Sequence, residues 1–198
     1  MRITREQSDG NKARIVEAAA ALFREKGFDG ISVAGLMRAA GLTHGGFYNH
    51  FESKDALEAA ACAKVFGNSV ANVGAVAAIA DPAERARAFA AYRRRYVSKK
   101  ARDAAAARCP MVAFAGDVSR QPPPVREQYA AGLRQYLDAF TRAAASGKTG
   151  RSARRRALAQ FAMLAGALTL ARSVADADPA LSDEILEAAA ASVDAPSA

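Results

Sequence analysis

The stretch GLTHGGFYNHFESKDAL, Gly41 to Leu57, decides the fold. Its apolar residues have helical spacing, with Phe47 and Phe51 four positions apart, yet Gly45 and Gly46 fall where a short helix should begin. A glycine inside a helix costs about 1 kcal/mol relative to alanine. That cost is explained if the backbone at these glycines must lie close to another surface.

Two short helices are predicted around a tight turn at Gly41–Leu42, one over about Ser32–Ala40 and one over about Thr43–Asn49. Before them, an apolar stripe predicts a helix from about Asn11 to Lys26 that Gly27 ends. The lengths and the turn indicate a helix-turn-helix. In that unit the second helix enters the major groove of DNA with its N-terminal residues at the base edges.

Polar side chains surround this second helix. Phe47 and Phe51 are expected to anchor its inner face, whereas Tyr48 and His50 project differently and can reach phosphates. Lys54 follows the cap residue Ser53 at the start of a fourth helix, where unbonded N–H groups and the helix dipole favour a phosphate. For the Tyr48 and His50 pair taken alone, the alternative is an ordinary surface pair.

The longer stretch RIVEAAAALFREKGFDGISVAGLMRAAGLTHGGFYNHFESKDAL, Arg14–Leu57, resembles the N-terminal domain of the TetR family of transcriptional regulators. The shared pattern is a helix ending in F…KGF, then SV, then AAGL, then G-F-Y-x-H-F-x-S-K-x-x-L. The resemblance implies an all-α fold of roughly nine helices and a homodimer. It also implies a helix-turn-helix DNA-binding domain over residues 1–55 and a ligand-binding and dimerisation domain over residues 56–198.

The resemblance further implies which residues contact DNA. The positions similar to phosphate-holding residues are Thr43, Tyr48, His50 and Lys54. The base-facing positions are occupied by His44, Gly45, Gly46 and Asn49. Because two of these are glycines, few side chains remain to read bases, which departs from the usual arrangement. Shape readout, or contacts from Ser32, Gly35 and Arg38, is therefore expected to carry more of the specificity.

The charge of the chain does not by itself locate a DNA-binding surface. The formal net charge is +8, yet residues 1–55 contain eight basic and seven acidic residues and contribute only +1. The excess lies mainly in Arg93–Arg102 and Gly150–Arg156, which are more typical of solvated helix faces and ends. An anionic partner is compatible with this charge, but the motif rather than the charge indicates DNA.

Sequence signals for secretion, membranes and catalysis are weak. Two cysteines imply no disulfide framework and favour a reducing, cytoplasmic location. The N-terminus lacks an apolar run, and no stretch approaches ~18 unbroken apolar residues, so neither a signal peptide nor a membrane span is expected. His44 and His50 lack partners with metal-ligand spacing. With only these two histidines in one short stretch, no Ser/His/Asp or paired-carboxylate constellation can be assembled. We therefore expect no metal, no cofactor and no enzymatic activity.

The last two predicted helices combine small and apolar residues that allow close approach. One contains Phe161, Ala162, Leu164, Ala165, Gly166, Ala167 and Leu168; the other contains Leu181, Ile185, Leu186, Ala189 and Val193. Pairing with a second copy would give a four-helix interface; an ordinary intramolecular core is the alternative. A loop is expected over Ser146–Ser152, and the tail after Val193 is expected to fray.

An apolar, aromatic pocket for a neutral or weakly polar effector is predicted in the second domain. Its candidate residues are Phe66, Tyr92, Tyr96, Cys109, Met111, Phe114, Tyr129, Leu133, Tyr136 and Met163. At these spacings the same residues are also typical of an ordinary hydrophobic core.

Cys109 stands before Pro110 at the predicted start of a short helix, with Arg108 beside it. A helix N-terminus and a neighbouring cation both stabilise a thiolate, the reactive form. A similar cysteine, at the head of the corresponding helix, occurs in the part of the TetR family that senses oxidants and electrophiles. Arg172, on the penultimate helix, is expected to approach it. The alternative is a small buried hydrophobic residue, which is also the role expected of Cys62.

These patterns predict a dimeric, ligand-responsive transcriptional regulator, with double-stranded DNA containing a palindromic operator and a small-molecule effector as its partners. A repressor released from its operator by a small molecule or an electrophile is the favoured form. The alternative is a small-molecule-binding helical dimer that has lost specific DNA binding.

Overall fold

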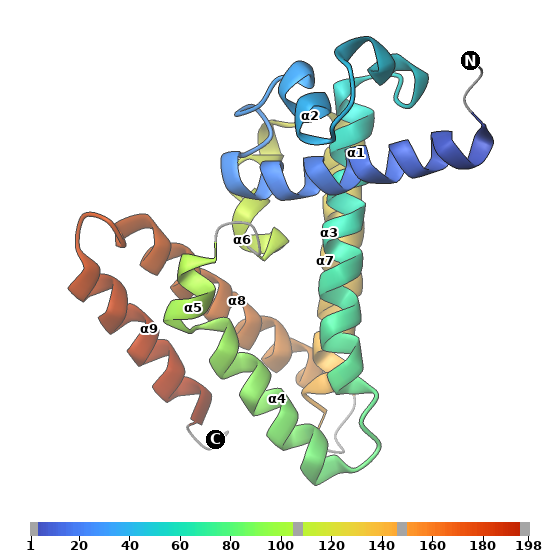
Figure 1. The fold of residues 1–198 in the computed structure, drawn as a ribbon. Coiled ribbons are helices and arrows are strands. Elements are labelled where there is room, and N and C mark those ends of the chain that lie inside the picture. The colour runs from blue at the N-terminus through green and yellow to red at the C-terminus, as the bar shows by residue number, and fades with distance from the viewer. Residues whose placement is uncertain (1–3, 105–108, 146–149, 195–198) are drawn as a thin grey trace. The chain divides into compact units, whose positions relative to one another are not determined.

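The computed structural model describes residues 4–104, 109–145 and 150–194. Within these ranges every regular element is a helix, which confirms the predicted all-α fold (Figure 1). Two elements are 3-10 helices, η1 (His44–Asn49) and η2 (Val118–Arg120). The nine α-helices described are α1 (Arg5–Lys26), α2 (Val33–Ala39), α3 (Lys54–Ala77), α4 (Pro82–Tyr96), α5 (Lys99–Asp103), α6 (Pro110–Phe114), α7 (Pro123–Ala143), α8 (Arg151–Val174) and α9 (Pro179–Asp194).

The chain forms two compact units that are not contiguous in sequence. Unit 1 comprises Met1–Asn68 and Cys109–Leu133, and unit 2 comprises Ser69–Arg108 and Arg134–Ala198. The predicted domain boundary after residue 55 falls in the first turn of α3, inside unit 1. Compactness and function can divide a chain differently, so the functional division at this boundary stays a prediction.

In unit 1, α1 begins earlier than predicted. Thr4 and Gln7 form a capping box: Gln7 N donates to Thr4 Oγ1 at 3.2 Å and Thr4 N donates to Gln7 Oε1 at 3.0 Å. The helix therefore begins at Arg5, and the predicted start near Asn11 was wrong, because the cap outweighs the polar, glycine-containing first turns. Its end is as predicted, at Gly27 with φ of 75°.

The second helix of the helix-turn-helix is a 3-10 helix rather than the expected α-helix. Gly46 N donates to the carbonyl of Thr43, three residues back, at 3.1 Å. Thr43 makes no side-chain capping bond, and the two glycines favour helix formation weakly. By contrast Ser32 caps α2, accepting a hydrogen bond from Gly35 N at 3.2 Å.

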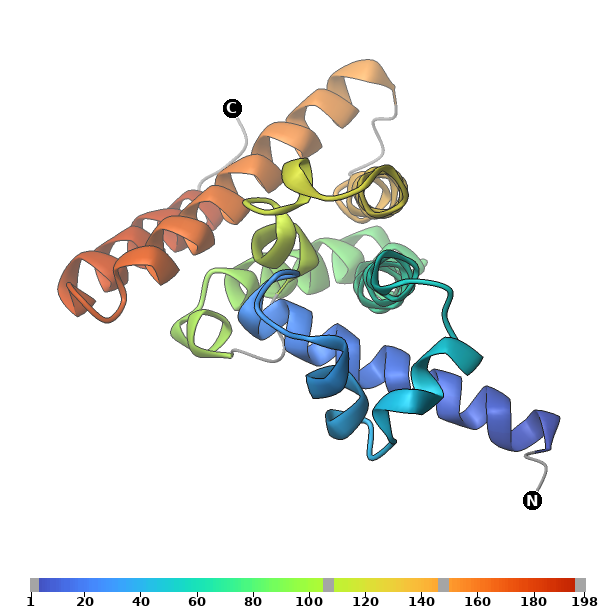
Figure 2. The ribbon, with the colours of Figure 1, turned by 90° about the horizontal axis from the view of Figure 1, so that it is seen from above.

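Unit 2 has an aromatic core, in which the ring of Phe140 contacts those of Phe89 and Phe161, and a pair of antiparallel helices, α8 and α9. Asp81 caps α4 by accepting a hydrogen bond from Glu84 N at 2.6 Å. Figures 1 and 2 show α8 and α9 running side by side from the turn that joins them. The start of α8 at Arg151 corrects the loop predicted over Ser146–Ser152, whose last two residues are helical. Residues 146–149 of that loop, Arg108 and most of the predicted frayed tail lie outside the described residues.

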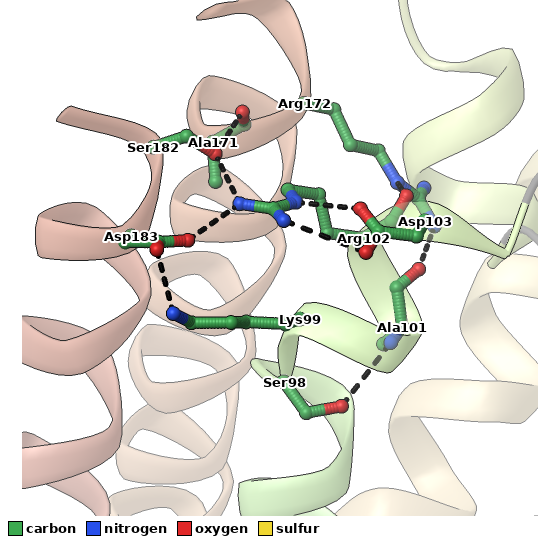
Figure 3. A network of polar contacts seen from close by, with 9 residues as sticks. All are labelled: Ser98, Lys99, Ala101, Arg102, Asp103, Ala171, Arg172, Ser182 and Asp183. Atoms are coloured by element: carbon green, nitrogen blue, oxygen red, sulfur yellow. Dashed lines mark hydrogen bonds and ion pairs between the residues drawn. The ribbon is translucent and has the colours of Figure 1, made fainter. Parts of the chain in front are cut away.

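A polar network fastens the short helix α5 to α8 and α9 (Figure 3). Arg102 Nη1 donates to Ser182 Oγ at 2.9 Å and to Asp183 Oδ1 at 2.7 Å. Lys99 Nζ donates to the other Asp183 oxygen at 2.6 Å, and buried Ser182 donates onward to the carbonyl of Ala171 at 2.7 Å. Hydrogen bonds from Lys99 and Arg102 hold the pKa of Asp183 below its ordinary value.

Candidate nucleic-acid interface

The 3-10 helix η1 has one buried face and one exposed face. Phe47 is 0% exposed and its ring stacks on that of Phe51 at 5.9 Å, so both aromatic residues anchor the inner face as predicted. The exposed residues of this segment are Thr43, His44, Gly45, Tyr48 and Asn49. Most of the DNA-contacting positions predicted in and beside η1 are therefore accessible at the surface.

Glycine is not required by the fold at positions 45 and 46. A Cβ at Gly45 would have no atom within 4 Å, and a Cβ at Gly46 would make only ordinary contacts, the nearest at 3.7 Å from Met37. Neither glycine is among those with positive φ. Packing and backbone conformation therefore leave room for a side chain at both positions.

Tyr48 is exposed, and its ring packs on the buried Phe47. It is 70% exposed, and its ring packs edge-on against Phe47 with centroids 5.2 Å apart. His50 is half-buried at the C-terminal cap of the same element. Thr43, at the other end, makes no capping bond with its hydroxyl. These three polar side chains lie at both ends and in the middle of η1, where they can donate to phosphate oxygens.

Ser32 and Arg38 lie on α2, and both are exposed. The Ser32 hydroxyl accepts the capping bond from Gly35 N, which leaves its own hydrogen available to donate. Arg38 lies in the last turn of α2, near the turn to η1. Both residues can supplement η1, as expected for an interface with few base-reading side chains.

Lys54 differs from the other candidates because its ammonium already has protein partners. Nζ donates to the carbonyl oxygen of Phe28 at 2.7 Å and pairs with Glu58 at 3.2 Å. The same ammonium lies over the Phe23 ring, 6.0 Å from its centroid. Lys54 thus ties the start of α3 to the segment after α1, a structural role that sequence reasoning missed.

Glu58 is a second residue that sequence reasoning missed. It is buried, and burial raises the pKa of its carboxyl group. Lys54, one turn earlier on α3, compensates the buried charge. The i, i+4 spacing of a Lys–Glu pair is the sequence signal that could have indicated this contact.

The ten predicted ligand-binding residues divide between the two units. Unit 1 contains Phe66, Cys109, Met111, Phe114, Tyr129 and Leu133, whereas unit 2 contains Tyr92, Tyr96, Tyr136 and Met163. In unit 2 the hydroxyls of Tyr92 and Tyr136 are 2.9 Å apart, and Tyr136 is fully buried against Phe161. The hydroxyl pair is a polar feature within an otherwise aromatic core. Its assignment to an effector stays a prediction.

In unit 1 the candidates form a second aromatic group. The rings of Phe66 and Tyr129 meet edge to face at 5.2 Å, and the Tyr129 hydroxyl donates to the carbonyl of Met111 at 3.4 Å. Burial raises the pKa of Tyr129 to about 12. Phe114 packs on Phe28 with centroids 4.7 Å apart. This group therefore contacts the segment that precedes the helix-turn-helix.

Cys109 is the N-cap residue of α6, as predicted, and is half-buried. Its Sγ lies 3.9 Å from the sulfur of Met111. Arg172 donates to the carbonyls at the end of α5, those of Ala101 at 2.6 Å and Arg102 at 3.2 Å. The approach of Arg172 to Cys109 stays a prediction.

Cys62 is a buried, free cysteine. Burial raises the pKa of Cys62 to about 12, so this thiol stays protonated at neutral pH, in keeping with a structural role.

By length and composition, α8 is the one helix of the described residues that could cross a membrane, with a mean hydropathy of 1.4 over its most apolar window. Only 28% of that window is buried within the chain.

Comparison with known proteins identifies the helix-turn-helix. Residues 15–61 match the family described as bacterial regulatory proteins, tetR family. A 59-residue stretch is 37% identical to an uncharacterized HTH-type transcriptional regulator, YerO of Bacillus subtilis (strain 168). The helix-turn-helix of this chain is that of the TetR family. The stretch shared with YerO covers 30% of this chain and only 20% of that relative's length.

Solved structures of TetR-family regulators share the whole fold. A regulator from Chloroflexus aurantiacus J-10-FL is 26% identical, with a TM-score of 0.73 over 95% of this chain and 94% of its own. The reduced form of Escherichia coli NemR is 19% identical, with a TM-score of 0.76 over 93% of this chain and 95% of its own. At such identity the NemR likeness concerns the fold alone.

Proposed function

We propose that this chain is a DNA-binding transcriptional regulator that acts as a homodimer and is released from its operator by a small-molecule effector. The observation that carries the proposal is the set of exposed polar residues in and beside η1, which the buried rings of Phe47 and Phe51 anchor. A helix-turn-helix enters the major groove with such a helix. The tetR-family match of residues 15–61 supports it.

The contacts with DNA follow from the chemistry of that face. The hydroxyls of Thr43 and Tyr48 and the imidazole of His50 donate to phosphates and set the register. His44 and Asn49 present side-chain donors and acceptors to base edges. The paired glycines let the backbone of η1 approach the groove floor. With so few base-reading side chains, the shape of the DNA contributes to specificity.

The homodimer would form through α8 and α9. Positions three or four apart on α8 expose an uncharged stripe, and α9 exposes another. These exposed residues are Ala162, Gly166, Thr169, Leu170 and Ser173 on α8, and Leu181, Ala188 and Ser192 on α9. Leu170 is 58% exposed and Leu181 is 41% exposed, unusual for large apolar side chains. A second copy would cover both stripes in a four-helix arrangement.

The exposed stripes sharpen the choice of interface residues. Leu168 and Leu186 are each 2% exposed, so both are already buried within one protomer. Leu170 and Leu181 instead face outward. Only 28% of the most apolar part of α8 is buried within the chain. A partner protomer that covers the exposed part would account for this without a membrane.

Release by an effector is proposed as a population shift. An effector that binds better to one spacing of the two reading heads would lower affinity for half-sites roughly 34–36 Å apart. Within unit 1, the packing of Phe114 on Phe28 offers a contact through which α6 could influence the helix-turn-helix. An electrophile that modifies Cys109 at the head of α6 is the second effector class.

The alternative function is a small-molecule-binding helical dimer that has lost specific DNA binding. A gel shift with the DNA upstream of the chain's own gene separates the two. The proposal expects a discrete complex that resists an excess of unrelated duplex and weakens steeply with salt. Complexes that unrelated duplex removes at equal concentration would favour the alternative.

A further inference from the structure

Arg14 of α1 reaches the turn that joins α2 to η1. Its Nη2 donates a hydrogen bond to the carbonyl oxygen of Ala40 at 2.7 Å. Ala40 is the C-terminal cap of α2, so the cation lies at the negative end of that helix, where the helix dipole favours it. The contact ties α1 to a turn 26 residues further along the chain.

Gly41, the next residue in the turn, also lies against Arg14. Its φ of 69° lies in the left-handed region that favours glycine. A Cβ at Gly41 would lie 2.9 Å from Arg14 Nη2, so a side chain there would crowd the guanidinium. The same nitrogen therefore bonds to one residue of the turn and lies against the next.

The turn decides how η1 is presented to DNA. Gly41 N donates to Arg38 O at 3.0 Å and Leu42 N donates to Met37 O at 2.9 Å, so both bonds run back to α2. The hydrogen bond from Arg14 instead links the turn to α1. Reading base edges requires geometry held within about 0.5 Å and 10–20°, whereas attraction to the phosphate backbone carries no sequence information.

We propose that Arg14 is a positioning residue for sequence reading, which fixes η1 relative to α1 without itself contacting bases. This inference rests on the proposed function. Removing Arg14 should then lower affinity for a specific site far more than affinity for unrelated DNA. Because Arg14 is exposed, the competing possibility is that its guanidinium binds a phosphate. In that case both affinities and the salt dependence would fall together.

The test compares Arg14→Ala and Arg14→Lys with Arg126→Ala, which removes the same charge from an exposed position of α7 in unit 1. The probes are a duplex enriched from random sequence by the wild-type protein and a scrambled duplex of equal length. Fluorescence anisotropy over a series of KCl concentrations gives the Kd for each duplex and the salt slope. Thermal unfolding reports whether each variant is folded.

The expected result for Arg14→Ala is a loss of about tenfold or more on the enriched duplex, the size of one good base contact. Affinity for the scrambled duplex and the salt slope should remain within error. Arg14→Lys, which keeps a donor of similar reach, should recover part of the loss, and Arg126→Ala should bind like the wild type. Equal losses on both duplexes with a slope lower by about 0.9 would overturn the positioning role in favour of a phosphate contact.

Amide hydrogen exchange provides a readout that needs no DNA. Loss of the Arg14 bond should speed exchange at the amides of Gly41 and Leu42 and in η1, while the core of α3 keeps its protection. Unchanged exchange at the turn would show that the hydrogen bond from Arg14 does not hold the turn, even if affinity fell. If the wild type enriches no sequence, the proposed function fails, and with it the role of Arg14 in sequence reading. The exchange data then report only whether Arg14 holds the turn.

Discussion

Replacing Gly45 or Gly46 by alanine should strengthen the fold and weaken the complex with DNA. The free protein has space for a methyl group at either position, and neither glycine has positive φ. Gly→Ala at a compatible position stabilises by about 0.4–1 kcal/mol. For a chain of this size that corresponds to a rise in Tm of about 1–4 °C.

On DNA, the same methyl group would have the opposite effect. If the backbone of η1 lies against the groove floor, the added methyl must push the helix outward and break at least one base contact, worth about 1–3 kcal/mol. Operator affinity should then fall about 5- to 150-fold. The matched control is Gly67→Ala on α3, where a Cβ also meets nothing within 4 Å. This control should raise Tm and leave affinity unchanged.

Differential scanning fluorimetry and anisotropy titrations on the same protein samples give both quantities. Wild-type affinity in Gly45→Ala and Gly46→Ala would refute the close approach of the backbone. A fall in Tm would refute the claim that the fold does not require these glycines.

Three further predictions concern other parts of the chain. Tyr48→Ala should weaken binding to all duplexes similarly and lower the salt slope by about 0.9, one phosphate contact; an unchanged slope in KCl titrations would exclude that contact. Leu170→Arg should give a folded monomer in sedimentation, whereas Leu168→Arg should lower the Tm because Leu168 is buried within one chain. If the Leu170→Arg variant still forms a dimer, the exposed stripe of α8 is not part of the interface. Because the pKa of Asp183 is lowered, its ion pairs stabilise the fold above the unfolded value of ~3.9 and are lost as pH falls below it. The stability of Asp183→Asn should therefore depend less on pH in this acidic range, and identical acid unfolding curves would contradict this.

Local chemistry made much of the fold predictable. Ser32 before an apolar stripe and Gly27 after one mark helix ends through hydrogen bonds made within a few residues. The start of α1 was missed because Thr4 and Gln7 cap it ahead of a stretch with little apolar periodicity. The 3-10 character of η1 was missed because α- and 3-10 helices differ by one residue in hydrogen-bond spacing, which side-chain periodicity over six residues does not distinguish.

For the candidate site, the sequence indicated which residues are polar and near the reading helix, but not which are already engaged. The partners of Arg14 and Lys54 are carbonyl groups 26 residues away in each case. Every residue offers a carbonyl, so no side-chain pattern reveals such contacts. Likewise, the sequence placed Leu168 among the apolar residues of a helix, and only the structure shows that Leu168 is 2% exposed whereas Leu170 is 58% exposed.

In the proposed function, two copies of this chain read DNA through η1. The most direct measurement of this reading is enrichment of random duplex DNA by the purified protein, followed by sequencing. The enriched sequence should be a palindromic site whose two half-sites are centred one helical turn apart, roughly 34–36 Å, or a multiple of that distance. The double variant His44→Ala and Asn49→Ala should lose the enrichment. No enriched sequence from the wild type, or the same sequence from the double variant, would contradict reading through η1.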